Sequence, residues 1–368
     1  MKYIPIAKPI IEKEDIASVV SVLKSGNLAS GQLVASFEKA FASYCGTKYA
    51  VSVSSGTTAL HLALWSLGIG KGDEVITTPF TYIASVNAIH MVGATSIFCD
   101  IDADTFNLNP KKIEEKITKR TKAILVVDLF GLPYFVPEIT ELAKKYNLHI
   151  IEDAAQAHGA SWKKTKTGNL GGVGCFSLYP TKNMVAGGGG VLTTNSKTVY
   201  EKCLLLRNNG HLHGSYNYQA FGLNYEMNEI AAALALAQLK KLDSRNAKRI
   251  LHAQTLAKTL NGIKGFILPS SPLGYTHVYH QFTVRITKNA KLTRDTFMKK
   301  MQSNGIDCRV YYPKSLHLYP HIAALGYKKG DFPIAESITQ EIVSVPIHPL
   351  VTDSELTYIS TTITQLLS

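Results

Sequence analysis

The chain has 368 residues, of which 45% are hydrophobic, and a net charge of +12; this size suits one large and one smaller α/β domain. No run approaches the roughly 18 apolar residues of a membrane span, and the basic residues do not gather in one stripe, so neither membrane insertion nor nucleic-acid binding is expected. Five scattered cysteines without a CxxC pair argue against a disulfide framework and favour the reducing cytoplasm.

The first part of the chain carries two amphipathic helical patterns, at 12–25 and 33–45, and Gly26 and Gly46 are placed to end them. Short β-rich runs then alternate with helical patterns, at 50–55, 74–80, 95–101, 123–130, 149–155, 175–180 and 190–195. Apolar strands that alternate with helices predict a mostly parallel sheet with helices on both faces.

A single long helical segment is expected over 227–261, with Asn228 as its N-cap. From about residue 263 a second α/β portion follows, with a strand at 279–286, a helix at 293–303 and a last helix near 353–367. We therefore predict a large domain over residues 1–250 and a small C-terminal domain over residues 251–368. No linker rich in Gly, Pro or Ser marks the boundary.

The segment 51–64 reads as a strand, a tight turn at Gly56 and a helix that begins near Thr57. The start of a helix presents free N–H groups and partial positive charge, which suit a phosphate group. The Thr57 hydroxyl would add a donor. An ordinary capped helix start has the same pattern, and no lysine follows the glycine as it would in a Walker loop.

Two acids, Glu152 and Asp153, end the apolar run at 149–155. In open α/β sheets the ligand crevice lies at the carboxyl ends of strands. An acid there can hold the protonated pyridine nitrogen of pyridoxal phosphate (PLP), which PLP needs in order to act as an electron sink. Gln156 could then bond the ring hydroxyl. A metal ligand or a turn cap is the alternative use of these acids.

Lys182 follows the run at 175–180 and precedes four glycines at 187–190. A lysine that forms a Schiff base must lose its proton before it attacks an aldehyde, and burial lowers its pKa. Ser177, five residues earlier, could reach a phosphate if the strand bends. A solvated loop lysine is the alternative.

Two further patterns carry no function. The GNLGGVG stretch at 168–174 partly matches a dinucleotide fingerprint, but it follows a polar stretch and leads into a strand instead of a helix. The histidines, among them His211, His213, His277 and His280, show no spacing typical of a metal site, so no metal is expected.

The chain resembles the DegT/DnrJ/EryC1/StrS family of PLP-dependent sugar aminotransferases from about residue 4 to residue 360. The segments that carry the resemblance, in order, are SSGTTALHLAL, TPFTY, EDAAQAHG, FSLYPTKNM, LRNNGH, GLNYEMNEIAAALALAQLKKLD, YYPKSLHLYP and SVPIHP. It implies the aspartate-aminotransferase type of fold, with a large domain built on a mostly parallel mixed sheet between helices and a smaller C-terminal α/β domain.

The resemblance also implies roles for single residues. Lys182 would form the Schiff base and then move a proton, while Asp153 would pair with the pyridine nitrogen and Gln156 with the ring hydroxyl. The other implied contacts are Gly56, Thr57 and Ser177 to the phosphate, Tyr82 stacked on the ring, Asn224 to the phosphate of the neighbouring subunit, and Tyr312 and His317 near the sugar. The Asn224 contact implies a homodimer with shared active sites.

The activity implied is transfer of an amino group from L-glutamate to a nucleotide-linked keto-deoxy sugar, with a 4-keto-6-deoxyhexose favoured, in amino-sugar and polysaccharide biosynthesis. The net positive charge would attract such an anionic ligand, or else serves solubility alone. A PLP-dependent sugar dehydratase, a cyclitol aminotransferase and a non-catalytic regulatory homologue remain alternatives. Gly172, Gly188 and Glu226 depart from the family, which often has Asp, Glu and Arg there.

Overall fold

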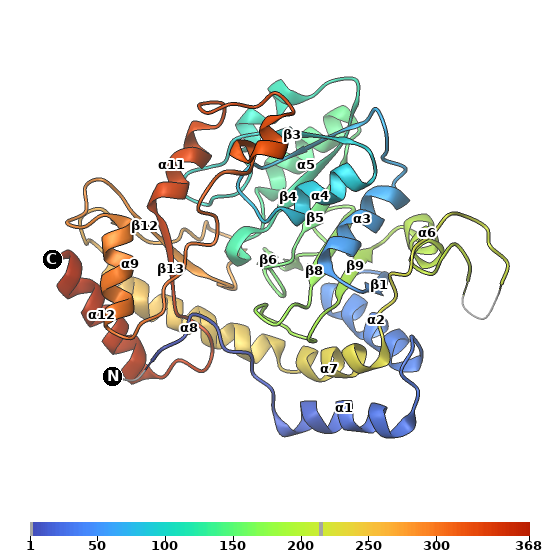
Figure 1. Cartoon of the computed structure of the whole chain (residues 1–368), viewed down its shortest axis with the longest axis horizontal. Coiled ribbons are helices and arrows are strands. Elements are labelled where there is room, and N and C mark those ends of the chain that lie inside the picture. The colour runs from blue at the N-terminus through green and yellow to red at the C-terminus, as the bar shows by residue number, and fades with distance from the viewer. Residues whose placement is uncertain (1–2, 213–215) are drawn as a thin grey trace.

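The computed structural model describes residues 3–212 and 216–368, so His213 lies outside the described residues. A seven-stranded sheet forms its centre, in the order β1-β9-β8-β5-β4-β2-β3 (Figure 1). The strands are β1 (Tyr49–Val53), β2 (Glu74–Thr77), β3 (Thr95–Phe98), β4 (Thr121–Val127), β5 (His149–Asp153), β8 (Val173–Ser177) and β9 (Gly190–Thr194). Only β9 runs antiparallel to its neighbours, which confirms the predicted mostly parallel mixed sheet.

Helices cover both faces of this sheet. Successive side chains of a strand point to opposite sides, so a strand that is apolar throughout needs a helix on each side. Val51 and Val53 of β1 pack with α3 (Gly56–Ser66) and α6 (Lys197–Arg207), and α4 (Ala84–Met91) joins the same core. Ala50, which precedes Val51 and points to the other face, packs instead with α2 (Gln32–Cys45) and α7 (Glu229–Leu239). The helix α5 (Val136–Tyr146) covers Ile124 and Ile150.

The two expected N-terminal helices are present as α1 (Lys13–Ser25) and α2. Gly26 and Gly46 follow them in the left-handed conformation, with φ of 73° and 76°, where glycine is favoured. Asn228 caps α7, since its Oδ1 accepts a hydrogen bond of 2.9 Å from the N–H of Ala231.

The prediction of one helix over 227–261 is wrong. The chain breaks into α7 and α8 (Leu242–Leu260) at Lys240 and Lys241. The Lys241 ammonium is held by Glu12 at 2.5 Å and Asp15 at 3.3 Å, both at the start of α1. Neither Gly nor Pro marks the break, so the sequence gives no local sign of it. The ion pairs at the break involve residues of α1, which helical periodicity cannot reveal.

A second core lies around the three-stranded sheet of β10 (Phe266–Ile267), β12 (Phe282–Ile286) and β13 (Ile342–Val345). It packs against α8, α9 (Arg294–Ser303) and α12 (Asp353–Leu367), on the side of the molecule opposite α6 (Figure 1). The N-terminal segment joins it, because Ile4 pairs with Ile306. Residue 250 falls within α8, and a domain boundary there stays a prediction.

The remaining elements are small or peripheral. A second three-stranded sheet joins β6 (Ser161–Trp162), β7 (Thr165–Lys166) and β11 (Tyr275–Thr276), strands too short for a sequence pattern to show. Two further helices are α10 (Pro320–Ala323) and α11 (Pro333–Glu341), of which α11 lies at the upper left in Figure 1. No helix in residues 3–212 or 216–368 is long and apolar enough to cross a membrane.

Candidate active site

The candidate residues meet at one edge of the large sheet. The strands β1, β8, β5 and β2 all run in the same direction, so their carboxyl ends share an edge. Gly56 follows β1, Tyr82 follows β2, Asp153 ends β5 and Ser177 ends β8. This is the edge at which open α/β sheets bind their ligands.

The start of α3 forms one wall of the site. Ser55 caps the helix: its Oγ accepts a 3.1 Å bond from the N–H of Thr58, whose Oγ1 accepts a 2.9 Å bond from the N–H of Ser55. The first N–H groups of a helix have no acceptor within the helix, so those of Gly56 and Thr57 have no partner inside α3. A Cβ on Gly56 would lie only 2.8 Å from the Cβ of Ser177, so only glycine allows this approach.

Asp153 is a buried carboxylate with two donors. Its Oδ2 accepts a 2.7 Å bond from the hydroxyl of Ser85, and its Oδ1 accepts a 3.2 Å bond from the N–H of Ala155. Burial raises the pKa of Asp153, while the bond from Ser85 and the charge of Lys182 oppose that rise. Ser85 lies in α4, and no sequence signal singled it out.

Two further buried acids, Glu152 and Asp128, accept hydrogen bonds from backbone N–H groups and so stabilise the fold. Glu152 accepts bonds of 2.7 to 2.9 Å from the N–H groups of Gly168, Leu170 and Gly171. The glycine-rich stretch therefore wraps a buried carboxylate and binds no dinucleotide phosphate there. Burial raises the pKa of Glu152 to about 7 and that of Asp128 well above its usual range, with the Glu152 charge adding to the shift at Asp128.

Gln156 is held in one orientation from both sides. Its Oε1 accepts a 2.8 Å bond from the N–H of Phe130, and its Nε2 donates a 2.8 Å bond to the hydroxyl of Tyr312. Tyr312 is buried between Phe80 and Phe130, with ring centroids 5.4 and 5.8 Å away. Tyr312 therefore contacts Gln156, and one amide hydrogen of Gln156 is left for another acceptor.

Lys182 lies on the loop that follows β8, where its N–H donates to the carbonyl of Tyr179 at 2.9 Å. Burial lowers the pKa of Lys182 to about 8, and the Asp153 carboxylate opposes the shift. The next residue anchors the loop, because Asn183 Nδ2 donates to Asn246 Oδ1 at 3.0 Å and Asn183 Oδ1 lies 3.2 Å from His280 Nδ1. A neutral amine is thus accessible close to physiological pH.

Three further candidates differ in their exposure, and one of them, Tyr82, contacts the cluster, because its carbonyl accepts a 3.2 Å bond from the Ser85 hydroxyl. His317 is fully buried, and its two ring nitrogens are bonded to Ser315 Oγ at 2.9 Å and Glu336 Oε1 at 3.0 Å, so neither is free for a sugar. Asn224 is exposed and pairs through its backbone with Asn208. The Tyr82 ring is 64% exposed. Their roles in binding stay predictions.

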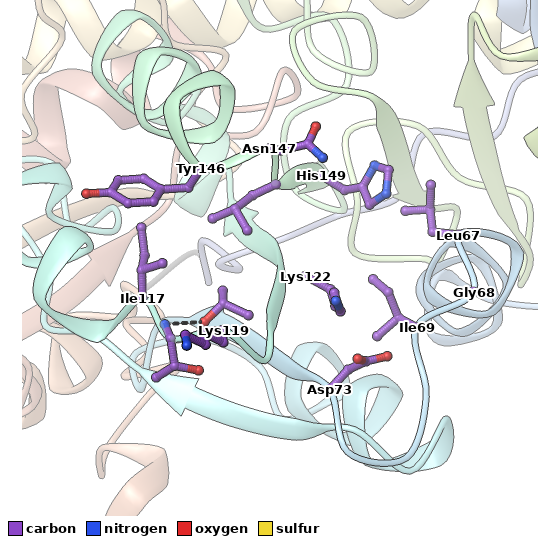
Figure 2. A pocket seen from close by; sticks show the side chains of 13 residues that line it. Leu67, Gly68, Ile69, Asp73, Ile117, Lys119, Lys122, Tyr146, Asn147 and His149 are labelled. Carbon is purple, nitrogen blue, oxygen red and sulfur yellow. Dashed lines mark hydrogen bonds between the residues drawn. The ribbon is translucent and has the colours of Figure 1, made fainter.

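A separate cavity of about 790 Å³ opens at the other edge of the sheet, at the amino ends of β4 and β5 (Figure 2). Lys119, Lys122 and His149 line it together with Asp73, and Figure 2 shows their side chains around its mouth. None of the candidate residues lines this cavity. Among the described residues, no group of three or more His, Cys, Asp or Glu side chains is arranged to hold a metal ion.

Known proteins match the chain over nearly its whole length. GDP-perosamine synthase from Caulobacter vibrioides is 38% identical over 371 residues, covering 99% of this chain and 98% of its own. The dTDP-3-amino-3,4,6-trideoxy-alpha-D-glucose transaminase from Streptomyces venezuelae is 39% identical over 340 residues, covering 92% and 88%. The crystal structure of DesV from S. venezuelae with a ketimine intermediate superposes with a TM-score of 0.93 at 36% identity, covering 98% of each chain.

The family model of the DegT/DnrJ/EryC1/StrS aminotransferases matches residues 9–364. This match spans the start of α3, the strand β5 with Asp153, the loop with Lys182 and the second core. The chain therefore belongs to the DegT/DnrJ/EryC1/StrS aminotransferase family.

Proposed function

We propose that this protein is a PLP-dependent aminotransferase that moves an amino group from L-glutamate to the ketone of a nucleotide-linked keto-deoxy sugar. One observation carries the proposal: a lysine of lowered pKa, a buried carboxylate and an open helix start share one sheet edge, in a chain of an aminotransferase family. Each group matches one part of PLP.

The residues fit PLP in chemistry. The start of α3 with Gly56, Thr57 and Ser177 suits the phosphate, because free N–H groups and hydroxyls gather there and Gly56 keeps the space open. Asp153 suits the ring nitrogen, and the free amide hydrogen of Gln156 suits the ring hydroxyl. Lys182 suits the aldehyde, since a neutral amine is needed there.

When bound, PLP supplies an aldehyde that takes up the amino group and a ring that draws electrons from the carbon that carried it. Asp153 would favour positive charge on the ring nitrogen, and the hydrogen bond from Ser85 orients the carboxyl group and opposes the rise in its pKa that burial causes. Lys182 would move a proton from the donor carbon to the cofactor in the first half-reaction and from the cofactor to the acceptor carbon in the second, and a pKa lowered to about 8 suits an amine for both tasks.

Two features support a nucleotide-linked sugar as the acceptor. The relatives named above act, by their names, on GDP- and dTDP-linked sugars, and the net charge of +12 here attracts an anionic diphosphate. The preference for a 4-keto-6-deoxyhexose rests on the NYEMNEIAAALALAQLKKLD stretch, which resembles enzymes that aminate carbon 4 more than those that aminate carbon 3. Because one relative is named for a 3-amino product, the position of the amine must be determined on the product.

A homodimer with shared sites forms part of the proposal. Asn224 is exposed on the single chain, and large aromatic side chains close to it in sequence are exposed too, Tyr216 at 90% and Phe221 at 93%. Exposed aromatic groups of this size are typical of interfaces between chains. This arrangement supports a partner that covers the segment and receives Asn224 in its own site.

The test is a reaction of the PLP-loaded protein with L-glutamate and a panel of UDP-, dTDP- and GDP-linked 3-keto and 4-keto sugars. We expect one of them to gain an amine, and mass spectrometry and NMR of the product would identify the nucleotide and the carbon. Loss of water in place of gain of nitrogen would indicate a dehydratase. Amination of a free cyclitol ketone alone, or no reaction of glutamate with the bound cofactor, would contradict the proposal.

A further inference from the structure

Two arginines of α8 line a small cavity that also reaches Lys182. The cavity lies between the N-terminal segment, the loop after β8 and α8, and its lining includes Lys8, Lys182, Arg245, Arg249 and Pro349. Its volume of about 20 Å³ holds one object the size of a water molecule. No acidic side chain is part of this lining.

Arg249 is a buried cation without an acidic partner in the described part of the chain. Its side chain is about nine-tenths buried, since only 8% of the residue is exposed. A long bond of 3.4 Å from Nη1 to the carbonyl of Tyr279 is its recorded hydrogen bond. Burial and the charge of Arg245 lower the pKa of Arg249 to about 10, although the Tyr311 phenol opposes the shift.

Arg245 adds a second incompletely satisfied guanidinium. Its Nη1 donates to Gln238 Oε1, but its buried Nη2 has no hydrogen-bond partner among the described residues. The nearest acid, Glu12, lies 3.5 Å from Nη2 and is already bound by Lys241 at 2.5 Å. Two cations thus share one cavity wall, and the acid near one of them is engaged elsewhere.

Burying an unpaired charge costs several kcal/mol, so buried cations in proteins are paired with anions. We propose that Arg245 and Arg249 form a binding site for one monoanionic group, a carboxylate or a halide, beside Lys182. The guanidinium N–H groups of the two arginines suit either group, and a halide or one end of a carboxylate matches the size of the cavity.

The site has a place in the reaction, and this part rests on the proposed function. An amino-acid donor must bring its amino group to the carbon at Lys182, and its carboxylate then needs a cation nearby. Arg249 and Arg245 line the same cavity as Lys182 and supply that charge. With no donor bound, a halide from solution would take the position.

The first experiment measures thermal unfolding of the PLP-loaded protein with increasing chloride, bromide, acetate and glutarate; glutarate resembles glutamate but has no amino group. We expect a saturable rise in the unfolding temperature, because a ligand of the native state stabilises it. Arg249→Met should abolish this rise. Without added anion Arg249→Met should also unfold no earlier than wild type, because it removes an unpaired charge; a merely structural arginine would destabilise when removed.

Arg294→Met is the matched control. The side chain of Arg294 is 10% exposed, pairs with Asp295, donates to the carbonyls of Thr339 and Ile342 and does not line the cavity. It should unfold earlier than wild type yet keep the full response to anions. Absence of a saturable response in wild type, or an equal response in Arg249→Met, would overturn the site. A response to halides alone would support the site with an inorganic anion as its ligand.

The second experiment separates this site from the proposed function. The concentration of L-glutamate that half-converts the bound cofactor should rise at least about 10-fold in Arg249→Met, a loss of about 1.4 kcal/mol. The cofactor absorbance should persist, and glutarate should compete in wild type only. If wild type does not react with glutamate, the proposed function fails whatever the anions do. If wild type and variant react equally, the donor role of the arginines is overturned and the function stands.

Discussion

At the scale of single residues, the site depends on the hydrogen bonds to the Asp153 carboxyl group and on the burial of the Lys182 amine. Burial raises the pKa of Asp153, and the hydrogen bonds from Ser85 and the backbone N–H of Ala155 oppose that rise. Burial lowers the pKa of Lys182 to about 8, so its amine loses its proton more easily than that of an exposed lysine. The identities of Asp153, Gln156 and Lys182 could be predicted from motifs, but Ser85 could not, because a serine inside a helix carries no signal of its own.

Ser85→Ala should weaken catalysis without unfolding the protein. Removing a hydrogen bond to a charged group costs about 1.5–3 kcal/mol, or roughly a 10- to 100-fold loss of kcat/KM. The measurement is the rate of the glutamate half-reaction followed by absorbance. Ser66→Ala is the control, because Ser66 is a buried serine of α3 whose hydroxyl donates a 3.0 Å bond to the carbonyl of Ala63; an equal loss in both variants would contradict a role for Ser85.

The lowered pKa of Lys182 predicts how cofactor-free protein takes up PLP. Only the neutral amine attacks an aldehyde, and for a lysine that form appears above the pKa. The rate of covalent uptake should therefore rise with pH through a midpoint near 8, well below the 10.5 of an ordinary lysine. Borohydride trapping at intervals would measure the rate. A midpoint near 10.5 would contradict the burial of the amine.

At the scale of elements, strand order and helix ends decide where these residues meet. Apolar runs and capping residues predicted the seven strands and most helices, since both signals are local. The break between α7 and α8 was missed, as were the strands β6, β7, β10, β11 and β13. Their causes are ion pairs and pairings between distant segments, which leave no period in the sequence.

The start of α3 is the element most sensitive to added volume. Gly56→Ala should place a methyl group 2.8 Å from Ser177 Cβ, push the helix start away from β8 and weaken PLP binding. Overpacking of this kind costs about 1–3 kcal/mol. Gly188→Ala is the matched control, because that position is open and has no positive φ. Titration of PLP by absorbance would compare them; equal affinity in the two variants would contradict the tight approach.

At the scale of the whole molecule, the chain forms two hydrophobic cores and exposes the segment around Asn224. Residues of the C-terminal third pack into both cores: Tyr312 and Leu316 join the core of the large sheet, while Phe297 and Ile359 join the second. The sequence predicted a second α/β portion but not this interleaving, because pairing between distant segments cannot be seen in local patterns. The partner chain was inferred from the resemblance and is supported here by exposure alone.

Shared sites can be tested by mixing two inactive variants. Lys182→Ala and Asn224→Ala each damage both sites of their own dimer. After dissociation and reassociation of an equal mixture, half of the dimers are mixed, and each has one intact site, so about a quarter of the wild-type activity should return. Light scattering would confirm the dimer. No recovery, with exchange demonstrated, would contradict a contribution of Asn224 across the interface.

Borohydride trapping followed by peptide mapping tests the central claim most directly, that Lys182 carries the cofactor of an aminotransferase. PLP-loaded protein should give one modified peptide, with the added mass on Lys182, and Lys182→Ala should give none. Treatment with L-glutamate before reduction should abolish the modification, because the amino group has then moved to the cofactor. Modification of a different lysine, or trapping that glutamate leaves unchanged, would contradict the account.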